Sequence, residues 1–258
     1  MRVKRLQGFY GKRSSEEVCV LYSGGKDSTY ALHWAVLKMF NVSCLVSIKP
    51  RSQESMMFHV PYVELTRLQA QALEIPLVYY EQGYESDEEA LRKALEIALR
   101  EYGCSGVVTG ALRSDYQRMR VAESAHMYGL NLYNPLWWRS QERYMFRLVD
   151  MGFHFIITSI TVKGLDPQLL GKELSREDIT SIINSSKIHG FNPAFEGGEA
   201  ETLVLDAPLF KKRLRVRGEA LRTGEYSWYF RISDARLEEK SHEEGISDVT
   251  KMGNSIYE

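Results

Sequence analysis

Six consecutive residues near the amino terminus combine the side chains and the backbone freedom that phosphate binding needs. They are Ser23, Gly24, Gly25, Lys26, Asp27 and Ser28. The two glycines let the backbone turn sharply and come close to a ligand, because no Cβ atom stands in the way. Lys26 adds a compact positive charge, and the serine hydroxyls can donate hydrogen bonds to phosphate oxygens. Asp27 could hold a Mg²⁺ ion that the phosphates carry, so we expect Lys26 and Asp27 to be catalytic.

The elements predicted around this loop place it where an anion binds. Residues 18–22 form a continuous apolar run, typical of a buried strand, and residues 27–39 carry apolar side chains at helical spacing. The first turn of such a helix presents unpaired N–H groups and the positive end of its dipole to a phosphate. The alternative is a plain strand-to-helix turn with a serine or aspartate cap, which leaves the lysine beside the two glycines unexplained.

Alternating strands and helices over the first half of the chain predict the fold. Apolar, β-prone runs recur at residues 42–48, 76–79 and 106–109. Amphipathic helical patterns separate them, and one of these opens with the capping-box pair Ser86 and Glu89. This alternation predicts an α/β fold with a doubly wound, mostly parallel sheet that helices cover on both faces.

The pattern changes after Pro135. Helical segments near residues 141–149 and 175–185 are followed by sequence rich in β-strand residues, which predicts a smaller α+β domain. The charged residues at the carboxyl end predict a polar tail. We therefore divide the chain into a polar amino-terminal extension (1–17), a first domain (18–135), a smaller second domain (136–237) and a polar tail (238–258).

A second polar stretch follows the strand predicted at residues 106–109. Gly110 would let the backbone approach a ligand closely, and Arg118 could pair with a carboxylate or phosphate through two hydrogen bonds. Ligands of parallel α/β sheets bind at the carboxyl ends of the strands, which favours a binding role over a helix cap with solvated arginines. We expect these residues to bind substrate: Ser114, Asp115, Tyr116, Gln117 and Arg118.

A third stretch concentrates negative charge in a loop before a predicted strand. Glu196, Glu199 and Glu201 lie around Gly197 and Gly198. Such a loop could bind Mg²⁺, attract an ammonium ion or act as general base on incoming ammonia. A solvated surface turn is the ordinary alternative. We expect Glu199 and Glu201 to be catalytic, and Glu196, Gly197 and Gly198 to bind substrate.

The loop at residues 23–28 reads SGGKDS and resembles the signature of the PP-loop, or N-type, ATP pyrophosphatases. All six residues match that signature and follow a predicted strand. The resemblance implies an adenine nucleotide alpha hydrolase-like fold, with ATP and Mg²⁺ as cofactors. It implies that the loop grips the β- and γ-phosphates and leaves the α-phosphate open to attack by a substrate oxygen. It also implies that Ser47 and Ile48 contact the nucleotide. We expect Gly110 to contact the nucleotide as well.

Together the three stretches are similar to the diphthine–ammonia ligase (diphthamide synthase) family. The matching segments are residues 23–28, 58–61 (FHVP), 110–118 and 196–210, within a similarity that spans roughly residues 18–217. Three features depart from the family pattern. Residues 1–17 are an additional lead-in, Ala200 stands where the family usually has an aromatic residue, and the chain is too short for the extra carboxyl-terminal domains of the eukaryotic relatives.

The resemblance implies a ligase that forms a C–N bond in two steps. ATP adenylates the carboxylate of diphthine, the modified histidine of translation elongation factor two, and pyrophosphate leaves. Ammonia then attacks the acyl-adenylate, and the products are diphthamide and AMP. Mg²⁺ and Lys26 would neutralise the charge that develops on the departing pyrophosphate. The first domain would bind ATP and the second domain would bind the substrate.

Two other functions remain open. A PP-loop enzyme that acts on RNA, such as a tRNA-modifying ligase or thiolase, would share the loop. Thiolases of that superfamily commonly need paired cysteines, whereas Cys19, Cys44 and Cys104 lie far apart in the sequence. A non-catalytic ATP-binding module would share the sheet and the loop, but it would not need the acidic loop. The oligomeric state is open too, with a homo-oligomer as one possibility.

The composition limits the compartment and the partners. The 258 residues carry a formal net charge of −1, so no overall field attracts nucleic acid or an anionic membrane, and no direct nucleic-acid contact is required. The sequence contains no run of about 18 consecutive apolar residues, which a helix needs in order to span a bilayer. The basic amino terminus is not followed by the continuous apolar segment of a signal peptide. We expect a cytoplasmic protein that acts on a protein substrate.

Overall fold

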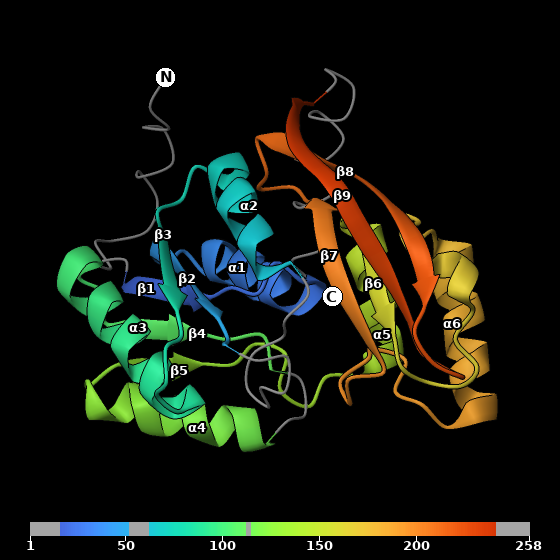
Figure 1. Cartoon of the computed structure of the whole chain (residues 1–258). Coiled ribbons are helices and arrows are strands. Elements are labelled where there is room, and N and C mark those ends of the chain that lie inside the picture. Colours follow the sequence, from blue (N-terminus) through green and yellow to red (C-terminus); the bar gives the residue numbers. More distant parts are fainter. Residues whose placement is uncertain (1–15, 52–61, 112–114, 241–258) are drawn as a thin grey trace.

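The computed structural model describes residues 16–51, 62–111 and 115–240, and it shows two β-sheets that lie side by side with their helices (Figure 1). Strands of the first half of the chain form a five-stranded sheet, and strands of the second half form a four-stranded sheet. The expected α/β fold with a smaller second sheet domain is confirmed. Ser114 and residues 58–61 lie outside the described residues, as do residues 1–15 and 241–258.

The first half of the chain alternates strands with helices. Its elements are β1 (Glu17–Leu21), α1 (Lys26–Leu37), β2 (Asn41–Lys49), η1 (Val63–Leu65), α2 (Thr66–Leu73), β3 (Leu77–Glu81), α3 (Asp87–Tyr102), β4 (Gly106–Val108), α4 (Asp115–Met127) and β5 (Asn131–Tyr133). The sheet order is β3-β2-β1-β4-β5, and neighbouring strands run parallel. The order reverses between β1 and β4, and ligands of open α/β sheets bind at such a switch point.

Alternate side chains of the central strand β1 enter two separate cores, as expected for a sheet that is buried on both faces. Val18 and Val20 pack in the core that contains α1 and α2, whereas Cys19 packs in the core under α3 and α4. Cys44 and Cys104 share this second core, and all three thiols are free and buried. Burial raises the pKa of the Cys44 thiol to about 12, so this cysteine behaves as a small hydrophobic residue.

The elements of this half match the sequence prediction closely, apart from their ends. Helix α1 begins at Lys26, one residue before the expected start, because Gly25 occupies the N-cap position. The Ser86 hydroxyl accepts a hydrogen bond of 3.2 Å from the Glu89 backbone N–H, which confirms one half of the predicted capping box. The sequence pattern does not predict β5, because a three-residue edge strand is too short to show a periodicity.

The second half of the chain forms an antiparallel sheet with two α-helices packed against it. Its elements are α5 (Gln141–Asp150), β6 (His154–Ile160), η2 (Pro167–Leu169), α6 (Arg176–His189), β7 (Ala200–Asp206), β8 (Lys212–Arg222) and β9 (Trp228–Glu239). The sheet order is β7-β6-β9-β8, so β7 is an edge strand. Strands β8 and β9 are longer than predicted, because charged side chains on their exposed face obscure the apolar pattern. β9 ends two residues inside the expected polar tail.

The two halves share a hydrophobic core and a hydrogen-bonded seam. Leu32 of α1 and Met145 of α5 are both fully buried in this common core. At the seam, the backbone N–H of Val204 in β7 donates to the Gly24 carbonyl over 3.0 Å. The fully buried Gln69 of α2 donates from Nε2 to the Gly24 carbonyl (3.0 Å) and to the Val204 carbonyl (2.7 Å). One side-chain amide therefore joins α2, the loop after β1 and the edge strand of the other sheet.

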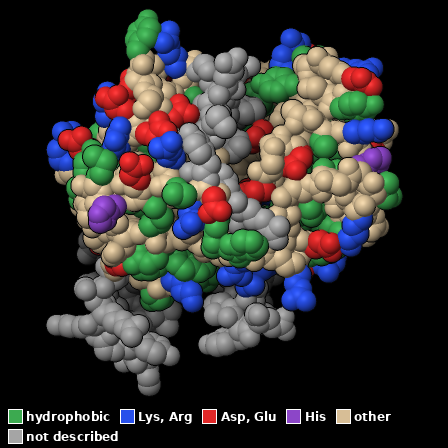
Figure 2. All heavy atoms as spheres, turned by 90° about the horizontal axis from the view of Figure 1, so that it is seen from below, with side chains coloured by type: hydrophobic (Ala, Val, Ile, Leu, Met, Phe, Trp, Pro, Cys, Tyr) green, Lys and Arg blue, Asp and Glu red, His purple; other side chains and the backbone are tan. Residues whose placement is uncertain are grey.

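Charged and hydrophobic side chains are mixed on the face of the molecule that Figure 2 shows. Figure 2, which views the molecule from below Figure 1, shows basic, acidic and hydrophobic side chains interspersed over the described part of this face. This mixture agrees with the formal net charge of −1. Among the described helices, none is long and apolar enough to cross a bilayer.

Replacing Gln69 with leucine tests the seam between the sheets. Gln69→Leu keeps most of the side-chain volume but removes the donors to two buried carbonyls, so we expect the free energy of unfolding to fall by about 1–3 kcal/mol. Urea denaturation followed by circular dichroism measures this change. Gln71→Leu, at an exposed position of the same helix, is the matched control and should change stability by less than about 0.5 kcal/mol. Equal stability of the two variants would contradict the role of Gln69.

Candidate active site

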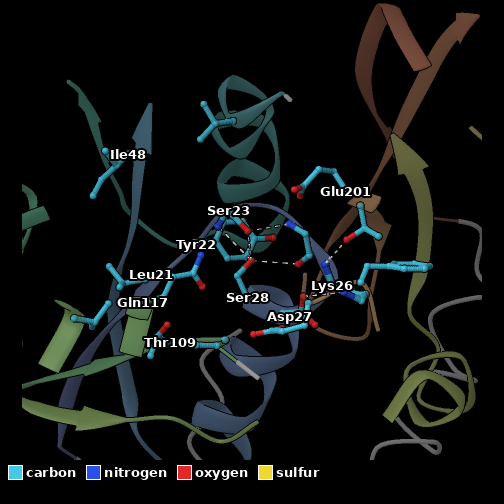
Figure 3. Close-up of a pocket in the computed structure, with 18 of the residues that line it drawn as sticks. Leu21, Tyr22, Ser23, Lys26, Asp27, Ser28, Ile48, Thr109, Gln117 and Glu201 are labelled. Carbon is cyan, nitrogen blue, oxygen red and sulfur yellow. Dashed lines mark hydrogen bonds and ion pairs between the residues drawn. The ribbon is translucent and has the colours of Figure 1, made fainter. Parts of the chain in front are cut away.

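One pocket lies where the two sheets meet, at the carboxyl ends of β1 and β4 (Figure 3). Three segments form its polar side: the loop at residues 23–28, residues 109–111 after β4, and residues 195–202 around the start of β7. An apolar wall lies next to them. It is lined by Leu21, Val46, Ile48, Val63 and Val121. Such a wall suits a flat uncharged ring, whereas the loop beside it suits phosphate.

The loop between β1 and α1 adopts a turn that favours glycine. Gly24 has φ of +81°, and a Cβ atom there would lie 2.4 Å from Oε1 of Gln69. Gly25 is the N-cap residue of α1. The hydroxyls of Ser23 and Ser28 lie 3.1 Å apart, and the Ser28 hydroxyl also bonds the Gly25 carbonyl over 3.2 Å. Five of the six loop residues line the pocket, and Gly24 supports the turn behind them.

Lys26 places a buried positive charge at the centre of the site. The residue is 2% exposed, and its Nζ lies 2.8 Å from Oδ2 of Asp27 and 5.5 Å from the centroid of the Phe195 ring. Burying an ammonium group is costly unless it is paired, and the carboxylate and the ring face offset part of that cost. The other carboxylate oxygen of Asp27, Oδ1, accepts a hydrogen bond of 2.8 Å from the Tyr144 hydroxyl. Neither Phe195 nor Tyr144 could be predicted from local sequence, because both residues reach the loop only through the fold.

Strand β7 brings a second contact to the phosphate loop. The backbone N–H of Lys26 donates to Oγ1 of Thr202 over 3.2 Å. This N–H belongs to the first turn of α1, where the backbone donors lack acceptors within the helix. Thr202 and its neighbour Glu201 both line the pocket. Thr202 was not among the predicted site residues, since a threonine inside a strand is typical of any sheet.

Gly110 is packed tightly against the start of α1, where a larger residue would not fit. A Cβ atom at Gly110 would lie 2.6 Å from the backbone carbonyl carbon of Asp27. Thr109 and Ala111 flank Gly110, and all three residues line the pocket. Gln117 of α4 also lines the pocket, where Figure 3 shows it near Leu21 at the apolar wall.

The other residues of the predicted substrate segment are placed differently. Asp115 is exposed and forms an ion pair of 3.1 Å with Arg118. The Arg118 guanidinium lies 4.6 Å from the centroid of the Trp137 ring. Neither Asp115 nor Arg118 lines the pocket that the described residues form. Tyr116 belongs to the first turn of α4, and Ser114 lies outside the described residues.

The two residues expected near the adenine have different positions. Ile48 lines the pocket, whereas the Ser47 side chain is buried and donates a hydrogen bond of 2.6 Å to the Tyr22 carbonyl. Ser47 therefore holds the end of β1 against β2, next to the phosphate loop. Tyr22 itself lines the pocket, and its hydroxyl accepts a hydrogen bond of 3.2 Å from Thr29 in α1.

The acidic loop divides into residues that face the pocket and a residue that shapes the loop. Glu196 and Glu201 line the pocket, and Figure 3 shows Glu201 close to the phosphate loop. Glu199 does not line the pocket that the described residues form. Its Oε1 accepts a hydrogen bond from the Asn192 N–H (3.0 Å), and its Oε2 accepts one from the Gly197 N–H (2.7 Å). This position suits a residue that holds the loop rather than one that contacts a ligand.

The two glycines of this loop lie at its exposed turn. Gly198 has φ of +80°, a conformation that favours glycine, and its carbonyl accepts a hydrogen bond of 2.6 Å from the Thr161 hydroxyl. Gly197 is exposed beside it. Both glycines therefore allow the turn that brings Glu196 and Glu201 to the same pocket.

The Asp27 carboxylate belongs to the phosphate loop itself, where it could bind a cation that phosphates carry. Among the described residues, no group of three or more His, Cys, Asp or Glu side chains could hold a metal ion by itself. Mg²⁺ that is already carried by phosphates needs only one or two protein carboxylates. The arrangement therefore fits an ion shared with a nucleotide, with Asp27 as its protein ligand.

Adding one methyl group at Gly110 tests the close packing that forms the pocket. Gly110→Ala forces the end of β4 away from α1, so we expect unfolding free energy to fall by about 1–3 kcal/mol. Affinity for a non-hydrolysable ATP analogue should fall about tenfold in calorimetry. Gly83→Ala is the control, because there the added Cβ meets only the flexible end of Glu85. Unchanged affinity in Gly110→Ala would contradict this account of the pocket.

Comparison with known proteins places this geometry in a family. The diphthamide synthase N-terminal domain model matches residues 16–132, and the diphthamide synthase C-terminal domain model matches residues 140–241. Diphthine–ammonia ligase of Mus musculus is 30% identical over 266 residues, which cover 93% of this chain and 98% of the mouse protein. Diphthine–ammonia ligase of Rattus norvegicus is 32% identical over 249 residues, and the match covers 86% of this chain and 93% of the rat protein.

The comparison also corrects one expectation about length. The diphthine–ammonia ligase of Schizosaccharomyces pombe is 31% identical over 77% of this chain, but the match covers 36% of the yeast protein. The mouse protein, in contrast, is covered almost entirely, so the chain is not too short for every eukaryotic relative. Two adjoining domain matches and 30% identity along nearly the whole mouse protein lead to one conclusion. The chain belongs to the diphthine–ammonia ligase family.

Proposed function

We propose that this chain is a ligase that forms the amide of diphthamide from diphthine, ammonia and ATP, with AMP and pyrophosphate as the other products. The observation that carries the proposal is that the SGGKDS loop, Glu196 and Glu201 line the same pocket. A phosphate-binding loop alone would suit many ATP-binding proteins. The acidic side of the pocket and the family membership favour amide formation over a module that only binds nucleotide.

ATP would bind with its pyrophosphate on the loop at residues 23–28 and its adenine against the apolar wall beside Ile48. The first turn of α1 offers backbone donors and the positive end of the helix dipole to the β- and γ-phosphates. Lys26 would neutralise the charge that develops when the bond between the α- and β-phosphates breaks. The diphthine carboxylate would attack the α-phosphate, and an acyl-adenylate would form.

Asp27 would hold Mg²⁺ together with the phosphate oxygens. The ion would supply positive charge to the leaving pyrophosphate. Lys26, paired with Asp27 before the nucleotide arrives, would be drawn toward the phosphates in the complex. Both groups therefore act on the same leaving group from one side of the pocket.

The acidic side of the pocket would receive ammonia and the modified histidine of elongation factor two. Glu201, which lines the pocket, would accept a proton from the attacking nitrogen as a general base. Glu196 would bind the substrate at the same end. Glu199 would keep these two carboxylates in place through its hydrogen bonds within the loop.

An assay with purified protein tests the proposed function. Diphthine-bearing elongation factor two, ammonium and MgATP should yield one AMP for each amide formed, measured by chromatography of nucleotides and mass spectrometry of the factor. Omitting ammonium should abolish the amide, and omitting the factor should abolish AMP release. Production of ADP instead of AMP, or binding of ATP with no turnover, would refute the proposal. Turnover with tRNA in place of the factor would point to an RNA-modifying enzyme.

Loss of the buried lysine tests the role of the phosphate loop. Lys26→Ala removes the cation that stabilises the leaving pyrophosphate, so we expect AMP formation to fall by at least about 100-fold, as when a single transition-state donor is removed. Lys38→Ala, at the exposed carboxyl end of the same helix, is the control and should retain activity. A Lys26→Ala protein that turns over ATP normally would show that another group binds the pyrophosphate.

Glu199→Ala separates the shape of the acidic loop from ATP binding. The variant frees two backbone N–H groups, so the loop should lose its fixed position, and amide formation should fall about tenfold or more. ATP affinity should stay within about threefold of the unmodified protein, because Glu199 does not line the pocket. Glu142→Ala, an exposed glutamate on α5, is the control. If Glu199→Ala instead bound ATP poorly, the loop would belong to the nucleotide site.

A further inference from the structure

Tyr144 connects the phosphate loop to the other half of the molecule through one hydrogen bond. Its hydroxyl donates to Oδ1 of Asp27 over 2.8 Å, and the residue is 2% exposed. The ring packs edge-on against the ring of Tyr30, with centroids 5.4 Å apart and an interplanar angle of 87°. Tyr144 belongs to α5 beside the antiparallel sheet, whereas Asp27 follows the central strand of the parallel sheet. Packing therefore fixes a donor from one half against a carboxylate from the other.

This hydroxyl keeps its proton under all working conditions. Burial, and next the negative charge of Asp27, raise the pKa of Tyr144 well above its usual range. A buried neutral phenol needs a hydrogen-bond partner, and Asp27 is the partner that the structure provides. The phenol is therefore the donor of this hydrogen bond, and the Asp27 carboxylate is its acceptor.

The two oxygens of Asp27 have different partners, which matters when a nucleotide binds. Oδ1 accepts from Tyr144, and Oδ2 pairs with Nζ of Lys26 over 2.8 Å. Pyrophosphate oxygens would attract the lysine ammonium away from Oδ2. Oδ2 would then be available to the Mg²⁺ that the nucleotide carries. Tyr144 bonds the other oxygen, so its hydrogen bond does not compete with that exchange.

We propose that Tyr144 is a positioning residue, which orients Asp27 so that Lys26 can move from Asp27 to the pyrophosphate of ATP. Tyr144 does not line the pocket and acts on the nucleotide only through Asp27. The inference rests on the proposed function in one respect, namely that the ligand of the loop is MgATP. It adds that the second half of the chain takes part in nucleotide binding through α5.

Calorimetry with a non-hydrolysable MgATP analogue tests this role without relying on amide formation. Tyr144→Phe removes only the hydroxyl, and affinity should fall about 10- to 100-fold, as expected for a lost hydrogen bond to a charged group. Tyr30→Phe is the matched control, because Tyr30 is a second buried tyrosine whose ring faces that of Tyr144, and affinity of this variant should change less than about twofold. Unchanged affinity in Tyr144→Phe would overturn the proposal.

A double-mutant cycle shows whether the hydroxyl acts through Asp27. In an Asp27→Ala background, Tyr144→Phe should cause no further loss of affinity, because the acceptor is absent. The same fold loss in both backgrounds would mean a general structural effect and would overturn the proposal. If a variant is too unstable for calorimetry, the same cycle is measured from the midpoints of urea denaturation at low temperature. Non-additive changes in midpoint support the coupling between Tyr144 and Asp27, and additive changes oppose it.

AMP formation measured on the same proteins keeps the two hypotheses apart. If the unmodified protein binds MgATP but makes no amide, the proposed function is wrong. The coupling of Tyr144 to Asp27 can still be measured from the binding affinities in that case. With active protein, Tyr144→Phe should raise the KM for MgATP and leave the KM for elongation factor two within about twofold. A rise confined to the KM for the protein factor would instead assign Tyr144 to the substrate side of the pocket and overturn the inference.

Discussion

The ion pair between Lys26 and Asp27 is the interaction on which the rest of the site depends. It places a lysine that is 2% exposed at the point where two sheets meet, and a buried charge of this kind has to be balanced by its surroundings. The surrounding structure meets that requirement from both halves. Strand β7 supplies Thr202 to the Lys26 backbone, and helix α5 supplies Tyr144 to the carboxylate. Residues from both halves of the chain therefore hold the phosphate loop in its conformation.

This dependence explains which parts could be predicted from the sequence. The SGGKDS loop is a local motif, and its flanking strand and helix have clear periodicities, so the loop, the parallel sheet and the approximate element limits are predictable. Gly110 and Gln117 were found because chain order places them after a neighbouring strand of the same sheet. Glu196 and Glu201 were found because negative charge between glycines is visible in the sequence itself.

The contacts between the two halves of the chain could not be predicted from local sequence patterns. Gln69 in a short helix, Tyr144 in a helix and Thr202 in a strand all have sequence surroundings typical of ordinary packing. Their roles come from residues more than 100 positions away in the case of Tyr144 and Thr202. Glu199 shows the converse limit, since its charge and its place in the motif made it resemble a catalytic group. The structure instead directs both of its oxygens to backbone N–H groups of its own loop.

The seam between Gly24 and Val204 has a consequence for how the chain is made. Strand β7 lies at the edge of its sheet, and an uncovered edge is a template on which another polypeptide can add. Synthesis proceeds from the amino terminus, so the loop at Gly24 leaves the ribosome about 180 residues before Val204 does. The loop at Gly24 has therefore already been synthesised when strand β7 leaves the ribosome. The backbone of Val204 is therefore paired with the loop at Gly24, and not left open, once the second sheet has formed.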